Sequence, residues 1–417
     1  MMSRSTDQHP ASMSDPATQA SPFGYYQQVH SSQPVKLDTA TGLWVIAGHA
    51  ELAEAARNWE VFSSEIDMRR GVSRVDSSAA DELLRRDGWI APDVLSQVDP
   101  PRHTRFRRLV AGLFTGPAVN RLQSYLDAHI VELLDRLPAD LPVDFMTHFA
   151  IPLPIDVIAD QLGVPREDAP LLKRWTDAII ETLNAMITAD RKLACTREIV
   201  DFQRYFVQLR ERKMREPRND ILSTLAVANT DEGVALTTEE FIAICAQLMV
   251  AGNETTRNHL AKGAWLLTQR ADLLQALHDE PTLAARFVDE TLRLESPVQG
   301  LFRRCTRDYP LGGAVIPAGA RVVLLYGAAN RDPREFPDPA ELRLDRPNVT
   351  RHMAFGHGIH GCVGRVLATA ELTAAFRHLT QRFEKIELDP SACEPAHKPH
   401  FSLRGLDSLS LILTRRM

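Results

Sequence analysis

Residues 355–364 read FGHGIHGCVG and gather four glycines, two histidines and one cysteine into ten positions. Cys362 has three chemical interpretations: a buried structural thiol, a zinc ligand, or an axial thiolate on haem iron. A zinc site would have to recruit His352, His357 or His360, and the chain offers no second cysteine at a recognised zinc-ligand spacing.

The residues around Cys362 favour the haem thiolate. Gly356, Gly358 and Gly361 would let the backbone pass close beneath a flat macrocycle, because glycine has no side chain to collide with it. The helix-like stretch 363–379 starts directly after the cysteine, and amides at a helix N-terminus stabilise a thiolate. Such a ligand donates electron density to iron and favours cleavage of the O–O bond.

The same ten residues match FGxGxHxCxG, the haem-binding signature of the cytochrome P450 family, at every fixed position. Four further segments resemble family motifs in the expected order, which are DPPRHTRFRR at 99–108, AGNETT at 251–256, ETLR at 290–293 and RRCTRD at 303–308. The likeness extends over nearly the whole chain after residue 23. The chain therefore resembles the soluble bacterial cytochromes P450.

The resemblance implies haem b (iron protoporphyrin IX) with the Cys362 thiolate as the ligand of its iron. Further cofactor-binding roles fall on the family-matched residues His103, Arg107, Arg303, Phe355, Gly356, His360 and Gly364. The histidines and arginines would pair with the two haem propionates, since buried carboxylates need cations or hydrogen-bond donors. Arg304 takes the place of Arg303 if the register differs by one residue. Phe355 would pack against the thiolate.

Two more groups of residues follow from the resemblance. Glu254 and Thr255 match the acid and the alcohol of the family's monooxygenases, a catalytic pair. They would carry from solvent the two protons consumed in oxygen reduction and O–O cleavage. Glu290 and Arg293 form the family's ExxR motif. They would join Arg346 in a structural ion network that braces the cysteine loop.

Most of the remaining sequence has a helical pattern. Residues 167–187 and 197–214 repeat apolar side chains every three or four positions. The stretch 237–267 begins with a capping box at Thr237 and Glu240 and continues with apolar residues on nearly every side, as in a helix buried inside a large protein. Short strands are expected at 42–48, 314–327 and 409–414, and an irregular meander at 330–348. The sequence thus predicts a mainly α fold with a smaller β-region, the cytochrome P450 fold, as a single large helical domain built around the long central helix.

Composition indicates the domain bounds, the compartment and the classes of partner to expect. Residues 1–22 are polar and are expected to form a disordered leader before a haem-thiolate monooxygenase domain at 23–417. With 44% hydrophobic and 24% charged residues and a net charge of −6, the chain offers no general basis for nucleic-acid binding. The five cysteines lie apart without a CxxC pair, which suits a reducing compartment. Without an apolar signal core or an 18-residue apolar run, we expect a cytoplasmic protein with no membrane span.

The predicted activity is that of a haem-thiolate monooxygenase that activates O2 and hydroxylates a hydrophobic small molecule. The resemblance implies electrons from NAD(P)H through a ferredoxin and an NAD(P)H-dependent ferredoxin reductase, because the chain has no evident room for a flavin or iron–sulfur domain. An acidic ferredoxin would dock near the cysteine loop, at Arg108 and Arg365. Apolar residues at family pocket positions would line the substrate site, which are Leu248, Ala251, Val298, Gly300, Phe302 and Phe401.

Other functions stay open at this point. A family member could instead catalyse desaturation, coupling or epoxidation in secondary metabolism. A haem-binding sensor or a zinc-stabilised interaction protein would also use a cysteine beside histidines. The fate of labelled dioxygen separates the enzyme hypotheses, and the colour and metal content of the purified protein separate the enzymes from the zinc protein.

Overall fold

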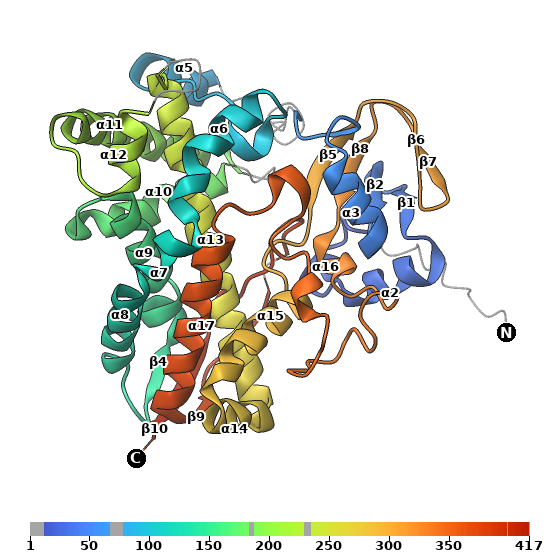
Figure 1. The fold of residues 1–417 in the computed structure, drawn as a ribbon, viewed down its shortest axis with the longest axis vertical. Coiled ribbons are helices and arrows are strands. Elements are labelled where there is room, and N and C mark those ends of the chain that lie inside the picture. Colours follow the sequence, from blue (N-terminus) through green and yellow to red (C-terminus); the bar gives the residue numbers. More distant parts are fainter. Residues whose placement is uncertain (1–11, 67–77, 183–186, 229–234, 398, 417) are drawn as a thin grey trace. The chain divides into compact units, whose positions relative to one another are not determined.

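The structure is a computed structural model that describes residues 12–66, 78–182, 187–228, 235–397 and 399–416 (Figure 1). The chain divides into two compact units, and neither is continuous in sequence. Among the described residues, the first unit holds 12–63, 289–359 and 394–407, and the second unit holds the rest. The mainly helical class predicted from the sequence is confirmed. Strands from distant parts of the chain pair within the first unit.

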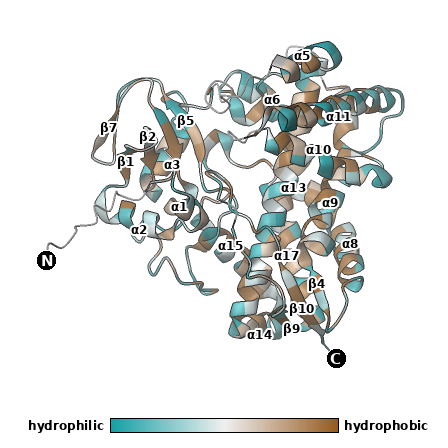
Figure 2. Cartoon of the chain, turned by 180° about the vertical axis from the view of Figure 1, so that it is seen from behind, coloured by the Kyte–Doolittle hydropathy of each residue, from teal (hydrophilic) through white to brown (hydrophobic). Residues whose placement is uncertain are grey.

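The second unit contains most of the helices, which lie side by side in Figure 1. Its α-helices are α5 Ser78–Asp87, α6 Arg102–Ala111, α7 Gly116–Asn120, α8 Gln123–Asp135, α9 Pro152–Leu162, α10 Ala169–Glu181, α11 Ala189–Arg215, α12 Ile221–Ala226, α13 Thr238–Gln269, α14 Ala271–Asp279 and α17 Arg365–Arg382. Its short helical turns are η1 Leu95–Gln97, η2 Gly112–Phe114, η3 Met146–Ala150, η4 Arg166–Asp168 and η5 Pro281–Leu283. α15, Ala284–Leu294, runs from this unit into the first. In Figure 2, hydrophilic and hydrophobic stretches alternate along α11, as expected for a helix with one face on the core.

α13 is the central helix that the sequence predicts. The Thr237 side chain accepts a hydrogen bond from the Glu240 amide, and the Glu240 carboxylate accepts one from the Thr237 amide, so the capping box is confirmed. Its first turns are buried on nearly every side. α17 packs along α13 where Gly263 leaves room, since a Cβ there would lie 2.2 Å from Cζ of Phe376. The N-terminus of α17 is thereby held in the same packed layer of helices.

A three-stranded antiparallel sheet completes the second unit. Its order is β4 Pro142–Asp144, β10 Ser410–Arg415 and β9 Phe383–Leu388. In the register, Leu411 faces Val143 on one side and Leu388 on the other. The strand expected at 409–414 is therefore present as β10, whereas β4 and β9 have no counterpart among the expected strands.

The first unit is built on a five-stranded sheet in the order β1-β2-β8-β5-β3. The strands are β1 Val35–Asp38, β2 Leu43–Ile46, β3 Phe62–Ser63, β5 Leu301–Cys305 and β8 Arg321–Leu324, with a separate hairpin of β6 Tyr309–Leu311 and β7 Ala314–Ile316. β2 and β8 run parallel with Trp44 opposite Val322, and the other pairs are antiparallel. α2 Phe23–Ser32, α3 His49–Arg57 and α16 Tyr326–Ala329 accompany this sheet, and η6 is Val349–Arg351. η7, Gly358–His360, crosses into the second unit.

The segment before residue 23 differs from its sequence-based expectation. Residues 12–22 are ordered and include α1, Pro16–Ala20. The Ser12 hydroxyl donates to both carboxylate oxygens of Asp38, at 3.0 and 2.9 Å, and the Met13 amide donates to the same group. Met13 is 3% exposed. A disordered leader is therefore wrong for residues 12–22, because Asp38 supplies acceptors and a hydrophobic cluster covers Met13. Residues 1–11 lie outside the described part. Among the described helices, none combines the length and the apolar character that a membrane crossing needs.

Candidate active site

Cys362 lies between η7 and α17, in the second unit, and its thiol is free and exposed. Gly364 is the N-cap of α17, and its backbone N–H donates to the cysteine sulfur. Burial raises the pKa of the thiol, whereas that hydrogen bond and the charges of Arg107 and Arg365 lower it. Many protein atoms surround the sulfur, and this is the burial that raises its pKa, but Cys362 still has accessible surface. A ligand can therefore reach it. The helix N-terminus and the two arginines favour the thiolate form that a metal would bind.

His360, two residues before the cysteine, belongs to a polar cluster in the same unit. Its Nε2 lies 2.9 Å from the Ser64 hydroxyl and 3.7 Å from Asp99 Oδ1. The ring of His103, on α6, is 4.5 Å from the ring of His360 between centroids. The structure thus brings together two of the residues predicted to bind propionates. It adds two partners of His360, namely Ser64, which no motif contains, and Asp99, the first residue of the segment 99–108.

Two predicted propionate ligands are cations without a carboxylate partner among the described residues. Arg107, half-buried on α6 in the second unit, makes no ion pair there, and burial lowers its pKa while Cys362 raises it. Arg303, on β5 in the first unit, is 5% exposed, and its Nη1 donates to its neighbour's carbonyl, the Phe302 oxygen. Arg304 is exposed, so the register that makes Arg303 the inward arginine is the better supported. Buried cations without counter-ions suit an anionic ligand.

The cysteine loop needs its glycines for more than one reason. Gly356 and Gly358 have φ of 72° and 70°, in the left-handed region that favours glycine. A Cβ on Gly358 would lie 2.1 Å from the carbonyl oxygen of Ala56, at the end of α3. Within the first unit, this glycine therefore permits close packing on α3, a role that the motif alone does not indicate. Phe355 lies 5.8 Å from the His352 ring between centroids.

Glu254 and Thr255 lie in the middle of α13 on different faces. Glu254 is 7% exposed, and its Oε1 accepts hydrogen bonds from Arg257 Nη2 at 2.8 Å and Asn258 Nδ2 at 3.1 Å. Arg257 also lies 4.0 Å from Asp177, on α10. Thr255 is half-buried and donates to the Ala251 carbonyl at 3.0 Å. The acid is thus paired within its own helix, and no hydrogen bond joins it to the threonine among the described residues.

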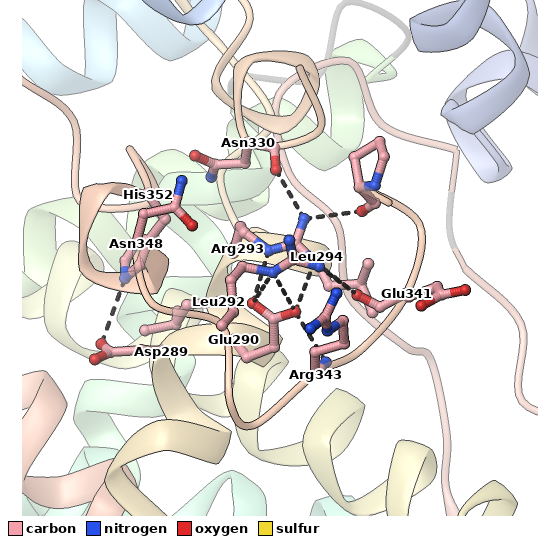
Figure 3. A network of polar contacts seen from close by, with 12 residues as sticks. Asp289, Glu290, Leu292, Arg293, Leu294, Asn330, Glu341, Arg343, Asn348 and His352 are labelled. Atoms are coloured by element: carbon pink, nitrogen blue, oxygen red, sulfur yellow. Dashed lines mark hydrogen bonds and ion pairs between the residues drawn. The ribbon is translucent and has the colours of Figure 1, made fainter. Parts of the chain in front are cut away.

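A buried ion network occupies the first unit (Figure 3). Glu290 and Arg293 are 0% exposed and Arg346 is 2% exposed. The Glu290 carboxylate accepts two hydrogen bonds from Arg293, at 2.7 and 2.8 Å, and one at 2.9 Å from Nε of Arg346. The Arg343 amide donates to the same carboxylate at 3.0 Å. One buried carboxylate therefore compensates two guanidiniums.

The same arginines hold the irregular segment 330–348. Their guanidiniums donate to backbone carbonyls of Asn330, Pro337, Asp338, Pro339 and Glu341. Asn330 Oδ1 in turn accepts from the Met353 amide at 2.6 Å, two residues before Phe355. Backbone groups that no strand or helix satisfies are thus paired with side chains. This connects the ExxR residues to the start of the cysteine loop, in the manner that the sequence predicts for a brace.

The predicted pocket residues divide by exposure. Leu248 is 5% exposed, whereas Ala251 is exposed in the interior of α13, on the same face as Thr255. Gly300 is buried. Val298 packs against one hydrophobic cluster of the first unit. Phe302 and Phe401 stack at 5.1 Å and pack against a second cluster.

Strand alternation adds Leu301 to the candidate pocket residues. Successive side chains of a strand point to opposite faces, so Phe302 lies opposite Arg303, and Leu301 shares the face of Arg303. Leu301 is 39% exposed. Phe302 stays a predicted pocket residue, and Leu301 is the apolar side chain that shares a face of β5 with the predicted propionate arginine.

These donors fit haem. In the second unit, a free cysteine at a helix N-terminus, the half-buried Arg107 with no ion pair among the described residues and the exposed Ala251 on α13 suit an anionic, apolar group with a thiolate-bound metal. In the first unit, the buried Arg303 offers a second cation of this kind. Within the described residues, no three His, Cys, Asp or Glu side chains gather closely enough to hold a metal ion, which leaves no zinc set around Cys362.

Comparison with known proteins agrees with this donor set. A family model described as Cytochrome P450 matches residues 143–405, more than half of the chain. The chain belongs to the cytochrome P450 family. It is a cytochrome P450 monooxygenase, and the cofactor of that family is haem with a cysteine thiolate ligand.

Three relatives show how far the likeness extends. Cytochrome P450 monooxygenase PikC of Streptomyces venezuelae is 33% identical, with 94% of this chain and 91% of the relative covered. The structure of cytochrome P450 CYP109Q5 from Chondromyces apiculatus has a TM-score of 0.84 at 29% identity and covers 97% and 98%. That of CYP109E1 from Bacillus megaterium in complex with testosterone has a TM-score of 0.79 at 31% identity and covers 95% and 99%.

The motifs missed several partners of the site residues. Arg257 lies three positions after Glu254 in one helix, a spacing at which opposite charges meet. The ion pair of this P450 could therefore have been predicted from the sequence. Asn258 follows from the same helix geometry. Ser64 had no such signal in the sequence, because a loop brings it to His360 from far away in the chain. Asp99 begins the segment 99–108, but that segment does not indicate His360 as its partner.

Proposed function

We propose that this P450 uses O2 to hydroxylate a hydrophobic small molecule. The exposed face of α13, with Ala251 and Thr255 beside the buried and paired Glu254, carries this proposal. An acid and an alcohol next to an apolar face supply what oxygen activation requires, namely protons in a place that otherwise excludes water. When bound, a haem-thiolate activates O2 and favours O–O cleavage.

Thr255 and Glu254 on α13 have different roles in the proposed proton delivery. The Thr255 hydroxyl, now bonded to its own helix, can turn to donate a proton toward the exposed face. The side chain of Glu254 accepts hydrogen bonds from Arg257 and Asn258 at the buried side of the helix. Arg257 reaches toward Asp177, whose side chain is 44% exposed, so the charged groups around Glu254 extend to the solvent.

The predicted cations of the site hold the cofactor. We propose that Arg107 and His103, with His360, bind one set of propionate oxygens, and that Arg303 binds others. His360 is oriented for this by Ser64 and Asp99. Leu301 and Ala251 would contact the substrate.

Bacterial members of the family receive electrons from redox partners, and we propose a ferredoxin with an NAD(P)H-dependent reductase for this one. Arg108 and Arg365, both exposed, support an acidic partner near the cysteine loop. Five free cysteines support the cytoplasm as the compartment. A relative that binds testosterone supports a hydrophobic substrate.

The test begins with a screen of hydrophobic compounds, testosterone first, for the low-spin to high-spin shift that follows displacement of a ligand water from iron. A compound that binds is then turned over with NADPH, ferredoxin, reductase and isotopically labelled dioxygen. We expect one labelled oxygen atom in the product. A product without the label contradicts hydroxylation and indicates desaturation or coupling, and binding without any turnover indicates a sensor.

A further inference from the structure

A cluster of charges in the first unit holds the N-terminal segment, residues 12–32, to the rest of that unit. Arg404 is at its centre, 6% exposed, and its Nε donates to Glu295 Oε2 at 2.7 Å. Its Nη1 donates to the carbonyl of Ala20 at 2.7 Å. This arginine therefore joins the end of α15 to the N-terminal segment through a buried ion pair and a backbone carbonyl.

An aromatic ring completes the cluster. The guanidinium of Arg331 lies 3.7 Å from the ring centroid of Phe23, and that of Arg404 lies 4.8 Å from it. Arg331 also lies 3.9 Å from Glu295 and donates to the carbonyl of Leu294. Two cations thus share one carboxylate, and the face of Phe23 supplies further negative potential. We call Ala20, Phe23, Glu295, Arg331 and Arg404 the N-terminal clamp.

The clamp is continuous with the backbone that leads into β5. The Arg404 amide donates to the Pro297 carbonyl at 2.8 Å, and the Gln299 amide donates to the Ser402 carbonyl at 2.7 Å. Val298 and Leu403 form an antiparallel bridge between these two bonds. The Tyr26 hydroxyl, from α2, donates to the Gln299 side chain. Residues 297–299 are consequently fixed on one side by 402–404 and on the other by the N-terminal segment.

We propose that Arg404 is a positioning residue, which sets the path of residues 297–303 and so the places of Leu301 and Arg303 in the substrate and haem site. The part that concerns haem and substrate rests on the proposed function. The N-terminal segment then influences which molecules fit by holding this strand.

The first measurement is hydrogen–deuterium exchange on the haem-loaded protein, which follows backbone hydrogen bonds directly. In Arg404→Gln, the charge and the second donor are lost, and we expect the amides of residues 297–303 to exchange about tenfold faster, while peptides of α8 keep their rates. The matched control is Arg334→Gln, since Arg334 ion-pairs with Glu51 and Asp332 in the same unit and is 54% exposed. Unchanged exchange in residues 297–303 of Arg404→Gln would overturn the proposal.

The second measurement is the binding of two iron-coordinating azoles, followed by their spectral shifts. Imidazole is small, whereas 4-phenylimidazole also fills space beside the iron. In Arg404→Gln, the affinity for 4-phenylimidazole should change about tenfold relative to that for imidazole, because only the larger azole probes the wall formed by residues 297–303. An unchanged ratio, or an equal loss for both azoles, contradicts a positioning role.

Phe23→Leu keeps the test decisive if Arg404→Gln does not fold. Leucine preserves the apolar contact and removes only the ring face. We therefore expect smaller changes of the same sign in the exchange rates and in the ratio of azole affinities. If neither quantity changes in Phe23→Leu, the clamp is refuted. The two proposals fail separately. If the product of the unmodified enzyme carries no labelled oxygen, the proposed function is wrong, while the exchange measurement on the haem-loaded protein still tests the clamp.

Discussion

At Glu254, a carboxylate inside a buried helix has its charge compensated by a neighbour one turn away. Arg257 and Asn258 come from the same helix as Glu254, so their hydrogen bonds to Glu254 do not depend on the position of α10. Asp177, on α10, extends this group of charges toward solvent. Among the described residues, the one hydrogen bond of the Thr255 hydroxyl by contrast goes to the Ala251 carbonyl of the same helix. The acid is thus fixed and the alcohol is free to turn, which is the division of roles that a proton relay needs.

Thr255→Ala tests this division. We expect NADPH consumption to continue while product formation falls roughly tenfold or more and peroxide rises, because proton delivery is lost while electron supply is not. The measurement is the ratio of product and peroxide to NADPH consumed. Thr268→Ala is the control, since that hydroxyl bonds a carbonyl of the same helix in the same way. A product yield per NADPH equal to that of the unmodified enzyme would remove Thr255 from the relay.

Glu371, on α17, is a second buried acid in the second unit. It is 3% exposed, its Oε1 lacks a hydrogen-bond partner among the described residues, and burial raises its pKa to about 8 from an ordinary value of 4.5. The folded protein thus keeps a proton there that the unfolded chain releases. Stability from this group therefore falls as the pH rises from about 4.5 to about 8.

Glu371→Gln should remove that dependence. The amide stays neutral, so the variant should gain stability over the unmodified protein as the pH approaches 8, by at most about 5 kcal/mol in the free energy of unfolding. Thermal melts between pH 5 and pH 8.5 measure the difference in stability between the two proteins. This is roughly the interval over which the folded and unfolded states differ in bound protons. Glu384→Gln, at an exposed position of β9, is the control. A difference that does not grow with pH would show that Glu371 is ionised in the folded protein.

At the scale of elements, close packing decides where glycine is needed. α13 and α17 approach each other at Gly263, and Phe376 fills the space with a ring that is 1% exposed and bounded by Phe287 at 5.0 Å. Gly263→Ala should lower the free energy of unfolding by about 1–3 kcal/mol, because the ring cannot withdraw and overpacking outweighs the gain in helix propensity. Chemical denaturation measures it. Gly24→Ala in α2, with no atom within 4 Å of the added methyl group, should change stability little, and equal effects in the two variants would contradict the packing argument.

The ion network joins α15 to an irregular segment that has no strand or helix to satisfy its carbonyls. Glu290→Gln leaves Arg293 and Arg346 buried with no carboxylate between them, which should cost about 3–5 kcal/mol. We expect less haem-loaded protein and a lower melting temperature, read from the ratio of haem to protein absorbance. Asp345→Asn, at the exposed pair with Arg343, should cost little. Full haem loading in Glu290→Gln would show that the network does not brace the cysteine loop.

At the scale of the whole molecule, local signals were sufficient for some elements and not for others. The capping box and the apolar run place α13, and the ten-residue signature places Cys362 before α17, since both depend on neighbours in the chain. The pairing of β2 with β8 and the division into two units depend on contacts between distant segments, which no local pattern contains. The order of residues 12–22 has the same origin, since Asp38 is their partner. Which face of β5 Phe302 occupies has the same origin, since the family position does not specify it.

The ligand of the iron is the point on which the whole account depends, and one spectrum tests it. The purified enzyme, reduced and saturated with carbon monoxide, should show the red-shifted Soret band that a thiolate ligand produces, and Cys362→Ala should lose it. Cys393→Ala, at another exposed cysteine, is the matched control and should keep the band. A red-shifted band that survives in Cys362→Ala, or its absence from the unmodified enzyme, would contradict the assignment.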